Sequence, residues 1–167
     1  MSDELDALDI RLLELLRDHP RVGVLELSRL SGVARATVTA RLQRMESSGV
    51  VTGHGPDIDT VAAGYPVQAL ATLEIAQGEL GDVTALLESL PGVLWAYATT
   101  GAGDVVCHLA AESNEELQQL LLDVTASGVI RRSTSVVILS VLVPPRALPL
   151  LKRRDRPWPA RTPPPAR

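Results

Sequence analysis

The residues between positions 35 and 44 have side-chain types that can contact duplex DNA. Between Arg29 and Met45 the chain has four arginines and no carboxylate, although its net charge at pH 7 is −4. Arginines bind phosphate oxygens and guanine edges, whereas small and hydroxyl side chains let a helix approach other bases closely. This chemistry predicts that DNA is contacted by Arg35, Ala36, Thr37, Thr39, Ala40, Arg41 and Arg44.

A helix-turn-helix motif is the element that would position these residues. Apolar residues recur at helical spacing on both sides of Gly32, which predicts helices over residues 24–30 and 34–48. The core-facing side of the second helix is predicted to be Val38, Leu42 and Met45. The opposite side would carry Arg35, Ala36, Thr39 and Ala40. The directions of Arg41 and Arg44 stay open, and the alternative for all three arginines is a solvated helix face that binds nothing.

A first helix and a linker complete the N-terminal half. Leucines within residues 5–16 recur at spacings of three and four, which predicts a helix over residues 6–17 that ends before Pro20. The predicted winged helix-turn-helix domain of three helices therefore spans residues 1–51. Residues 52–65 contain three glycines and one proline and are predicted to form a linker.

Residues 66–143 have the periodicities of a ferredoxin-like βαββαβ domain, so the predicted fold class is α+β. The expected order is strand 67–75, helix 83–90, strand 93–100, strand 104–111, a helix capped at Ser113, and strand 136–143. Helices cover only one face of such a sheet. Because Trp95 and Tyr97 alternate onto one side of their strand, we expect a second copy of the chain to cover the other face, giving a homodimer.

Charge is distributed unevenly along the chain. Residues 1–55 contain seven arginines and eight acidic residues, a net charge of −1. Residues 56–143 contain two arginines and eleven acidic residues, a net charge of −9. Residues 144–167 contain seven basic residues and one aspartate, a net charge of +6. The proline- and arginine-rich residues 144–167 are predicted to be a disordered tail that cannot bury a core. This tail could be an inert end, a polyproline segment that binds a partner, or an added contact with the DNA backbone, which we favour.

The other reactive groups give no support for catalysis or metal binding. Cys107 is the only cysteine, and the three histidines fall in separate elements. Four aromatic residues are too few for a surface that stacks single-stranded bases. The longest apolar run, residues 136–145, is too short to cross a bilayer. We therefore predict a cytoplasmic protein with no enzyme activity, no cofactor and no membrane partner.

Together these motifs resemble the Lrp/AsnC (leucine-responsive, feast/famine) family of prokaryotic transcription regulators, over residues 5–143. The N-terminal motifs are Leu5-Asp6-x-x-Asp9, Glu26-Leu27-Ser28, Thr37-Val38-x-x-Arg41-Leu42 and Met45-Glu46-x-x-Gly49-Val50-Val51-x-Gly53. The C-terminal motifs are Pro91-Gly92-Val93, Thr100-Gly101-x-x-Asp104 and Gly128-Val129 followed by Thr134. The departures are Ala34, where a capping serine is common, His54, where an aromatic is common, and Gly103, where a larger residue is frequent.

The resemblance implies a nucleoid-associated regulator that binds double-stranded DNA, with Arg41 among the contacts, and forms homodimers that assemble into tetramers or octamers. It also implies an amino-acid effector between dimers, held by Thr100, Gly101, Ala102, Gly103, Asp104 and Thr134. Asp104 would pair with the α-ammonium group of that effector. The alternative for this loop is a plain hairpin turn whose glycines supply positive φ.

Two other functions are compatible with parts of the sequence. An architectural protein that compacts DNA with little sequence preference is consistent with the basic tail. Siroheme decarboxylases also resemble this family throughout, but they need basic and aromatic residues around a tetrapyrrole. Here the sheet region offers only Arg131 and Arg132 as basic residues, together with few aromatics.

Overall fold

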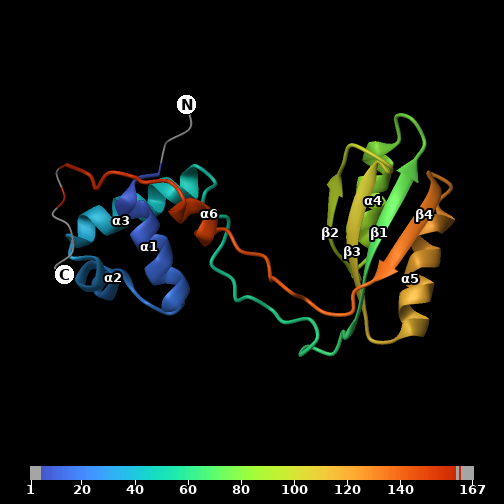
Figure 1. Ribbon diagram of the computed structural model, residues 1–167, viewed down its shortest axis with the longest axis horizontal. Helices are drawn as coiled ribbons and strands as arrows, with labels where there is room; N and C mark the ends of the chain where they lie inside the picture. Colours follow the sequence, from blue (N-terminus) through green and yellow to red (C-terminus); the bar gives the residue numbers. More distant parts are fainter. Residues whose placement is uncertain (1–4, 161, 163–167) are drawn as a thin grey trace. The chain divides into compact units, whose positions relative to one another are not determined.

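The computed structural model describes residues 5–160 and residue 162 (Figure 1). The chain forms two compact units, one of residues 1–56 with 144–167 and the other of residues 57–143. The chain therefore passes from the first unit to the second and back again. As a result, the last described residues belong to the same unit as the first ones.

Three helices form the first unit, as the sequence predicts: α1 Ala7–Asp18, α2 Val24–Ser31 and α3 Arg35–Ser47. α1 begins with a capping box in which Asp9 N donates to Asp6 Oδ1 at 3.1 Å and Asp6 N donates to Asp9 Oδ2 at 2.9 Å. The box satisfies two amides that have no partner within the first helical turn. α2 ends at Gly32, whose φ of 71° lies in the left-handed region that favours glycine.

The three helices enclose one apolar core. Its buried side chains come from the leucine stripe of α1 and from the inner faces of α2 and α3: Leu8, Leu12, Leu15, Leu27, Val33, Val38 and Met45. The residue before α3, Ala34, gives no side-chain hydrogen bond to the first turn. A missing cap costs a helix about 1 kcal/mol. The position of α3 therefore depends on this packing and on its polar contacts with α1.

The second unit is a four-stranded antiparallel sheet with two helices on one face. Its elements are β1 Val67–Ile75, α4 Leu80–Ser89, β2 Val93–Ala98, β3 Val105–Ala111, α5 Asn114–Ala126 and β4 Ile130–Val137. The strand order β2-β3-β1-β4 confirms the predicted ferredoxin-like fold. α4 and α5 pack on the fully buried side chains of Ala71, Leu73 and Leu109 in the two central strands.

The opposite face of the sheet, which we call the open face, carries the alternate residues of the same strands. Leu70 of β1 lies there between His108 of β3 and Val136 of β4. Trp95 and Tyr97 of β2 are on this face, as predicted, with ring centroids 5.0 Å apart. Apolar and aromatic side chains therefore stand on the face of the sheet that neither α4 nor α5 covers.

The last strand does not lie where the sequence predicts it. The expected strand covers residues 136–143, whereas β4 begins at Ile130 and ends at Val137. Beyond β4, Leu139 and Leu142 are 96% and 90% exposed. The prediction is wrong because it followed an apolar run. β4 instead consists largely of polar residues such as Thr134, which an edge strand with an open face can carry.

The predicted disorder of residues 144–167 also differs from the structure. The short helix α6 Leu148–Lys152 packs against α1 (Figure 1). Trp158 packs against the core of the first unit. The segment has little apolar area of its own, but it adds Trp158 to a core that other helices have already formed. Residues 161 and 163–167 of the predicted tail lie outside the described residues.

Candidate DNA-binding surface and effector loop

One side of α3 is exposed along most of its length. Val38 and Met45 are fully buried on the inner side. The exposed side, which we call the α3 stripe, consists of Arg35, Ala36, Thr39, Ala40 and Gln43. Their spacings of one, three and four residues place them on a single helix face. The stripe contains four of the seven DNA contacts that the sequence predicts.

Gln43 is the member of the α3 stripe that the sequence prediction missed. It follows Thr39 by four residues, which is the spacing that brings two side chains onto one helix face. Its amide can donate to and accept from the major-groove edge of adenine. Gln43 is neither basic nor a hydroxyl residue, so only its helical spacing indicates that it belongs to this face. Thr37, a predicted contact, is half-buried beside the stripe.

Arg41 and Arg44 point towards α1 and not along the stripe. Arg41 Nη1 lies 2.6 Å from Asp6 Oδ2 and 3.3 Å from Asp9 Oδ1. Arg44 forms an ion pair with the other oxygen of Asp9, whose side chain is 0% exposed. A carboxylate removed from water needs such partners because its desolvation is costly. We call these four residues the α1–α3 ion-pair network, because they join the capping box of α1 to α3.

Asp6 remains ionised in this network at neutral pH. Partial burial raises the pKa of Asp6, but hydrogen bonds from the Asp9 amide and from Arg41 outweigh burial and leave the pKa below its ordinary value of 3.8. A carboxyl group with a lowered pKa stabilises the fold fully above its unfolded-state pKa, and this contribution disappears as the pH falls through the folded-state pKa. The contribution of Asp6 is therefore lost only in acid below that ordinary value.

The loop between β2 and β3 contains most of the predicted effector residues. Thr100, Gly101 and Ala102 are exposed at its tip. Asp104 closes the loop onto the end of β1, because its amide donates to Leu73 O at 2.8 Å and its Oδ2 accepts from Ile75 N at 2.8 Å. The structure therefore gives Asp104 a role in the hairpin, which engages one of its two carboxylate oxygens.

Thr72 of β1 joins the loop to Thr134, the remaining predicted effector residue. Thr72 and Thr134 are direct cross-strand partners. On the other side of Thr72, Gly103 approaches so closely that an added Cβ would lie 2.3 Å from Thr72 Cγ2 and 3.3 Å from Leu73 O. The loop and Thr134 are thus brought together by a residue that the sequence prediction missed, since strand register is not visible in local periodicity.

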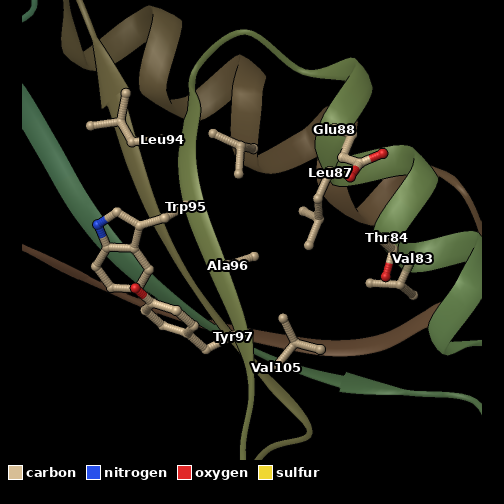
Figure 2. Close-up of a pocket in the computed structure, with 10 residues that line it drawn as sticks. Val83, Thr84, Leu87, Glu88, Leu94, Trp95, Ala96, Tyr97 and Val105 are labelled. Carbon is tan, nitrogen blue, oxygen red and sulfur yellow. The ribbon is translucent and has the colours of Figure 1, made fainter. Parts of the chain in front are cut away.

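A cavity of about 250 Å³ lies elsewhere in the second unit, between α4 and the edge strand β2. Figure 2 shows Leu87 of α4 and Ala96 of β2 facing one another across it, with Trp95 and Tyr97 directed to the opposite side of the strand. Its lining is mostly apolar, with the carboxylate of Glu88 at one side, and it includes none of the predicted effector residues. This cavity therefore does not combine the groups that would hold a zwitterion.

The described residues include one cysteine and three histidines besides their carboxylates. No group of three or more His, Cys, Asp or Glu among them is placed to hold a metal ion. Burial raises the pKa of the Cys107 thiol to about 11, which disfavours the reactive thiolate. Burial lowers the pKa of His108, which lies on the open face. In the described part of the chain, none of the helices is long and apolar enough to span a membrane.

Both units match known protein families. Residues 5–52 match the family described as winged helix-turn-helix DNA-binding, and residues 68–148 match the Lrp/AsnC ligand binding domain. The chain is 27% identical over 141 residues to the HTH-type transcriptional regulator FL11 of Pyrococcus furiosus, covering 84% of this chain and 93% of that protein. It is 31% identical over 123 residues to the HTH-type transcriptional regulator AldR of Mycobacterium tuberculosis, covering 72% of this chain and 69% of that protein. The structure of AsnC from E. coli matches with a TM-score of 0.81 and 26% identity, covering 87% of this chain and 99% of that chain.

Proposed function

The chain belongs to the Lrp/AsnC family of DNA-binding transcriptional regulators, and we propose that it recognises a specific operator through the α3 stripe and responds to an amino acid. The observation that carries the proposal is the composition and exposure of that stripe. Arg35 and Gln43 are of the types that form paired hydrogen bonds with guanine and adenine, while Ala36 and Ala40 let the helix enter the major groove closely. The relatives named above are transcriptional regulators, which supports a non-enzymatic role.

Substitution of Arg35 tests this assignment. Arg35→Ala is expected to weaken binding to the preferred duplex by about 1–3 kcal/mol and to relax the sequence preference, because the variant loses a base contact. Fluorescence anisotropy with the preferred duplex and a shuffled duplex measures both effects. Arg131→Ala, which removes an exposed arginine from the second unit, is the matched control. Equal affinities for the wild type and Arg35→Ala on both duplexes would remove Arg35 from the interface.

Arg41 and Arg44 have a different role in this proposal. Their ion pairs with Asp6 and Asp9 support a positioning role, in which they hold α3 at a fixed angle on α1. They contribute to DNA recognition through the orientation of the α3 stripe. Thr37, half-buried at the edge of the stripe, is proposed as a contact with the DNA backbone, which a short hydroxyl side chain can reach.

We propose that two copies of the chain associate through the open face of the sheet. Leu70, Trp95, Tyr97 and Val136 present apolar surface there, and the most common symmetric dimer buries the same patch on both copies. A two-fold dimer carries two α3 stripes and reads two half-sites separated by one helical turn of DNA or a multiple of it. We also propose that these dimers assemble into tetramers or octamers and that the protein associates with the nucleoid.

The effector proposal places an amino acid beside the β2–β3 loop. Asp104 has one carboxylate oxygen bonded to Ile75 N, and the other is proposed to pair with the α-ammonium group. The hydroxyl groups of Thr72, Thr100 and Thr134, with the amides of Gly101, Ala102 and Gly103, are proposed to bind the carboxylate or side chain. Effector binding would change the population of assembly states and so the engagement of neighbouring half-sites.

Isothermal titration of the wild type against the twenty amino acids tests the effector site. At least one amino acid is expected to bind. Asp104→Asn keeps an oxygen that can accept from Ile75 N, and it should weaken that binding about tenfold or more, because a hydrogen bond to a charged group contributes about 1.5–3 kcal/mol. The absence of heat for every amino acid, or an unchanged affinity in Asp104→Asn, would overturn the proposed site.

A further inference from the structure

The C-terminal strap, which we define as residues 144–160, is a docked part of the first unit. Lys152 Nζ lies 2.6 Å from Glu14 Oε1 in α1. Ala7 N donates to Pro157 O at 3.4 Å, and Arg156 Nη1 donates to Leu5 O. The strap therefore contacts α1 near its first residues and again in its third turn.

Trp158 provides the apolar anchor of the C-terminal strap. It is partly buried and packs against the core of leucines that also positions α3. Tryptophan has a large apolar area, so a single buried side chain can hold a segment that has little other apolar surface.

The ion pair of Lys152 also affects Glu14. Burial raises the pKa of Glu14, but hydrogen bonds and charge from Lys152 and Arg11 outweigh burial and lower the pKa. Glu14 thus remains a carboxylate at neutral pH and keeps its attraction for the strap.

Docking of the strap reverses the charge of the DNA-binding unit. Residues 1–56 contain seven arginines and eight acidic residues, whereas residues 144–167 contain seven basic residues and one aspartate. The first unit as a whole therefore has a net charge of +5, while residues 57–143, with two arginines and eleven acidic residues, have a net charge of −9. The strap alone contains five basic residues and one aspartate, a net charge of +4, so the unit that carries the α3 stripe is positive because the strap belongs to it.

Some basic residues of the strap are used internally, and others are left exposed. Lys152 pairs with Glu14, and Arg156 bonds to the backbone of Leu5. Arg153 and Arg154 are exposed, and within the described residues neither forms an ion pair. Two neighbouring arginines held on a folded support, without a protein carboxylate opposite them, are suited to the phosphate oxygens of DNA.

We propose that the C-terminal strap is a second DNA-contacting element, in which Arg153 and Arg154 bind backbone phosphates beside the operator half-site read by the α3 stripe. The inference rests on the proposed function, since it requires that the first unit binds DNA. Phosphates carry no base identity, so the strap strengthens binding to every duplex equally and leaves sequence preference to α3. Release of condensed counterions gives such contacts a characteristic dependence on salt concentration.

The test compares the salt dependence of DNA binding in point variants of the full chain. Anisotropy titrations of the preferred and the shuffled duplex over a salt series are made for Arg153→Ala, Arg154→Ala and the control Arg131→Ala. Each strap variant is expected to reduce the slope of log affinity against log salt by about 1 on both duplexes. Arg131→Ala should leave the slope unchanged, and Arg153→Lys and Arg154→Lys should retain the wild-type slope.

The outcomes distinguish a failure of the strap proposal from a failure of the proposed function. Wild-type slopes in both alanine variants, with the wild type still preferring its operator, would overturn the strap proposal alone. No binding of the wild type to any duplex would overturn the proposed function as well. Docking is tested in a Trp158→Ala background that remains folded by circular dichroism. In that background, Arg153→Ala should change the salt slope by clearly less than 1. If Arg153→Ala still changes the slope by about 1, docking of the strap is not required for the phosphate contact.

Discussion

Replacement of Asp9 by alanine is expected to destabilise the first unit by about 3–5 kcal/mol, which is the usual cost of removing one partner from a buried ion pair. The Asp9 side chain is 0% exposed, and it pairs with both Arg41 and Arg44. It also accepts from Asp6 N in the capping box. The substitution therefore leaves two guanidinium groups without their buried carboxylate and one helix terminus without half of its cap. Urea unfolding followed by circular dichroism measures the loss.

Asp18→Ala is the matched control for Asp9→Ala. Asp18 lies at the other end of the same helix and is exposed, so its removal should change stability by less than about 0.5 kcal/mol. The Asp9 variant should also lose operator binding, because the α3 stripe is no longer held in position. If Asp9→Ala and Asp18→Ala unfold at the same urea concentration as the wild type, the α1–α3 ion-pair network does not hold α3 as proposed.

Val136→Lys is expected to convert the protein into a monomer. Val136 is 59% exposed on the open face, opposite Leu70. A lysine there is tolerated by an isolated chain in water, but burial of its ammonium group without a partner in a dimer interface costs several kcal/mol. Light scattering after size exclusion should give the mass of one chain, 17.8 kDa, where the wild type gives a multiple of it. Operator affinity should fall by about a factor of 10² or more, because two linked half-site contacts become one.

Leu122→Lys is the control for the dimer interface. Leu122 is 54% exposed, which is close to the exposure of Val136, but it lies on α5, on the helical side of the sheet. The same change of charge and size should there leave the mass and the operator affinity unaltered. Retention of the wild-type mass by Val136→Lys would place the dimer interface elsewhere, and loss of assembly in both variants would point to a general effect of charge.

The sequence was sufficient to predict the three helices of the first unit and the order of elements in the second. Leucine spacing located α1, and Gly32 marked the turn before α3. Alternating strand residues indicated the ferredoxin-like sheet. The inner residues Val38 and Met45 of α3 were predicted because helical period alone decides which side of a helix is apolar. Arg35, Ala36, Thr39 and Ala40 of the α3 stripe were predicted from the same period, whereas Gln43 was missed because its chemical type had not been considered.

Other features depend on contacts between distant residues and could not be predicted from periodicity. Arg41 lies at the edge of the apolar stripe, and its partner Asp6 is 35 residues away in the sequence, so local spacing left its direction open. Thr72 joined the effector loop only through strand register. The docking of Trp158 depends on a surface formed by α1 at the other end of the chain. In each case the decisive partner lies outside the window over which a periodic pattern is read.

The central claim is that the α3 stripes of a two-fold assembly read specific DNA sequences. The most direct test is selection of bound duplexes from a pool of random sequences by the purified wild-type protein, because it assumes no operator. The expected result is a single two-fold symmetric motif, with half-site centres one helical turn or a multiple of it apart, bound about 10³ times more tightly than random DNA. A bound pool that stays random in sequence through successive rounds would contradict it and would favour an architectural role.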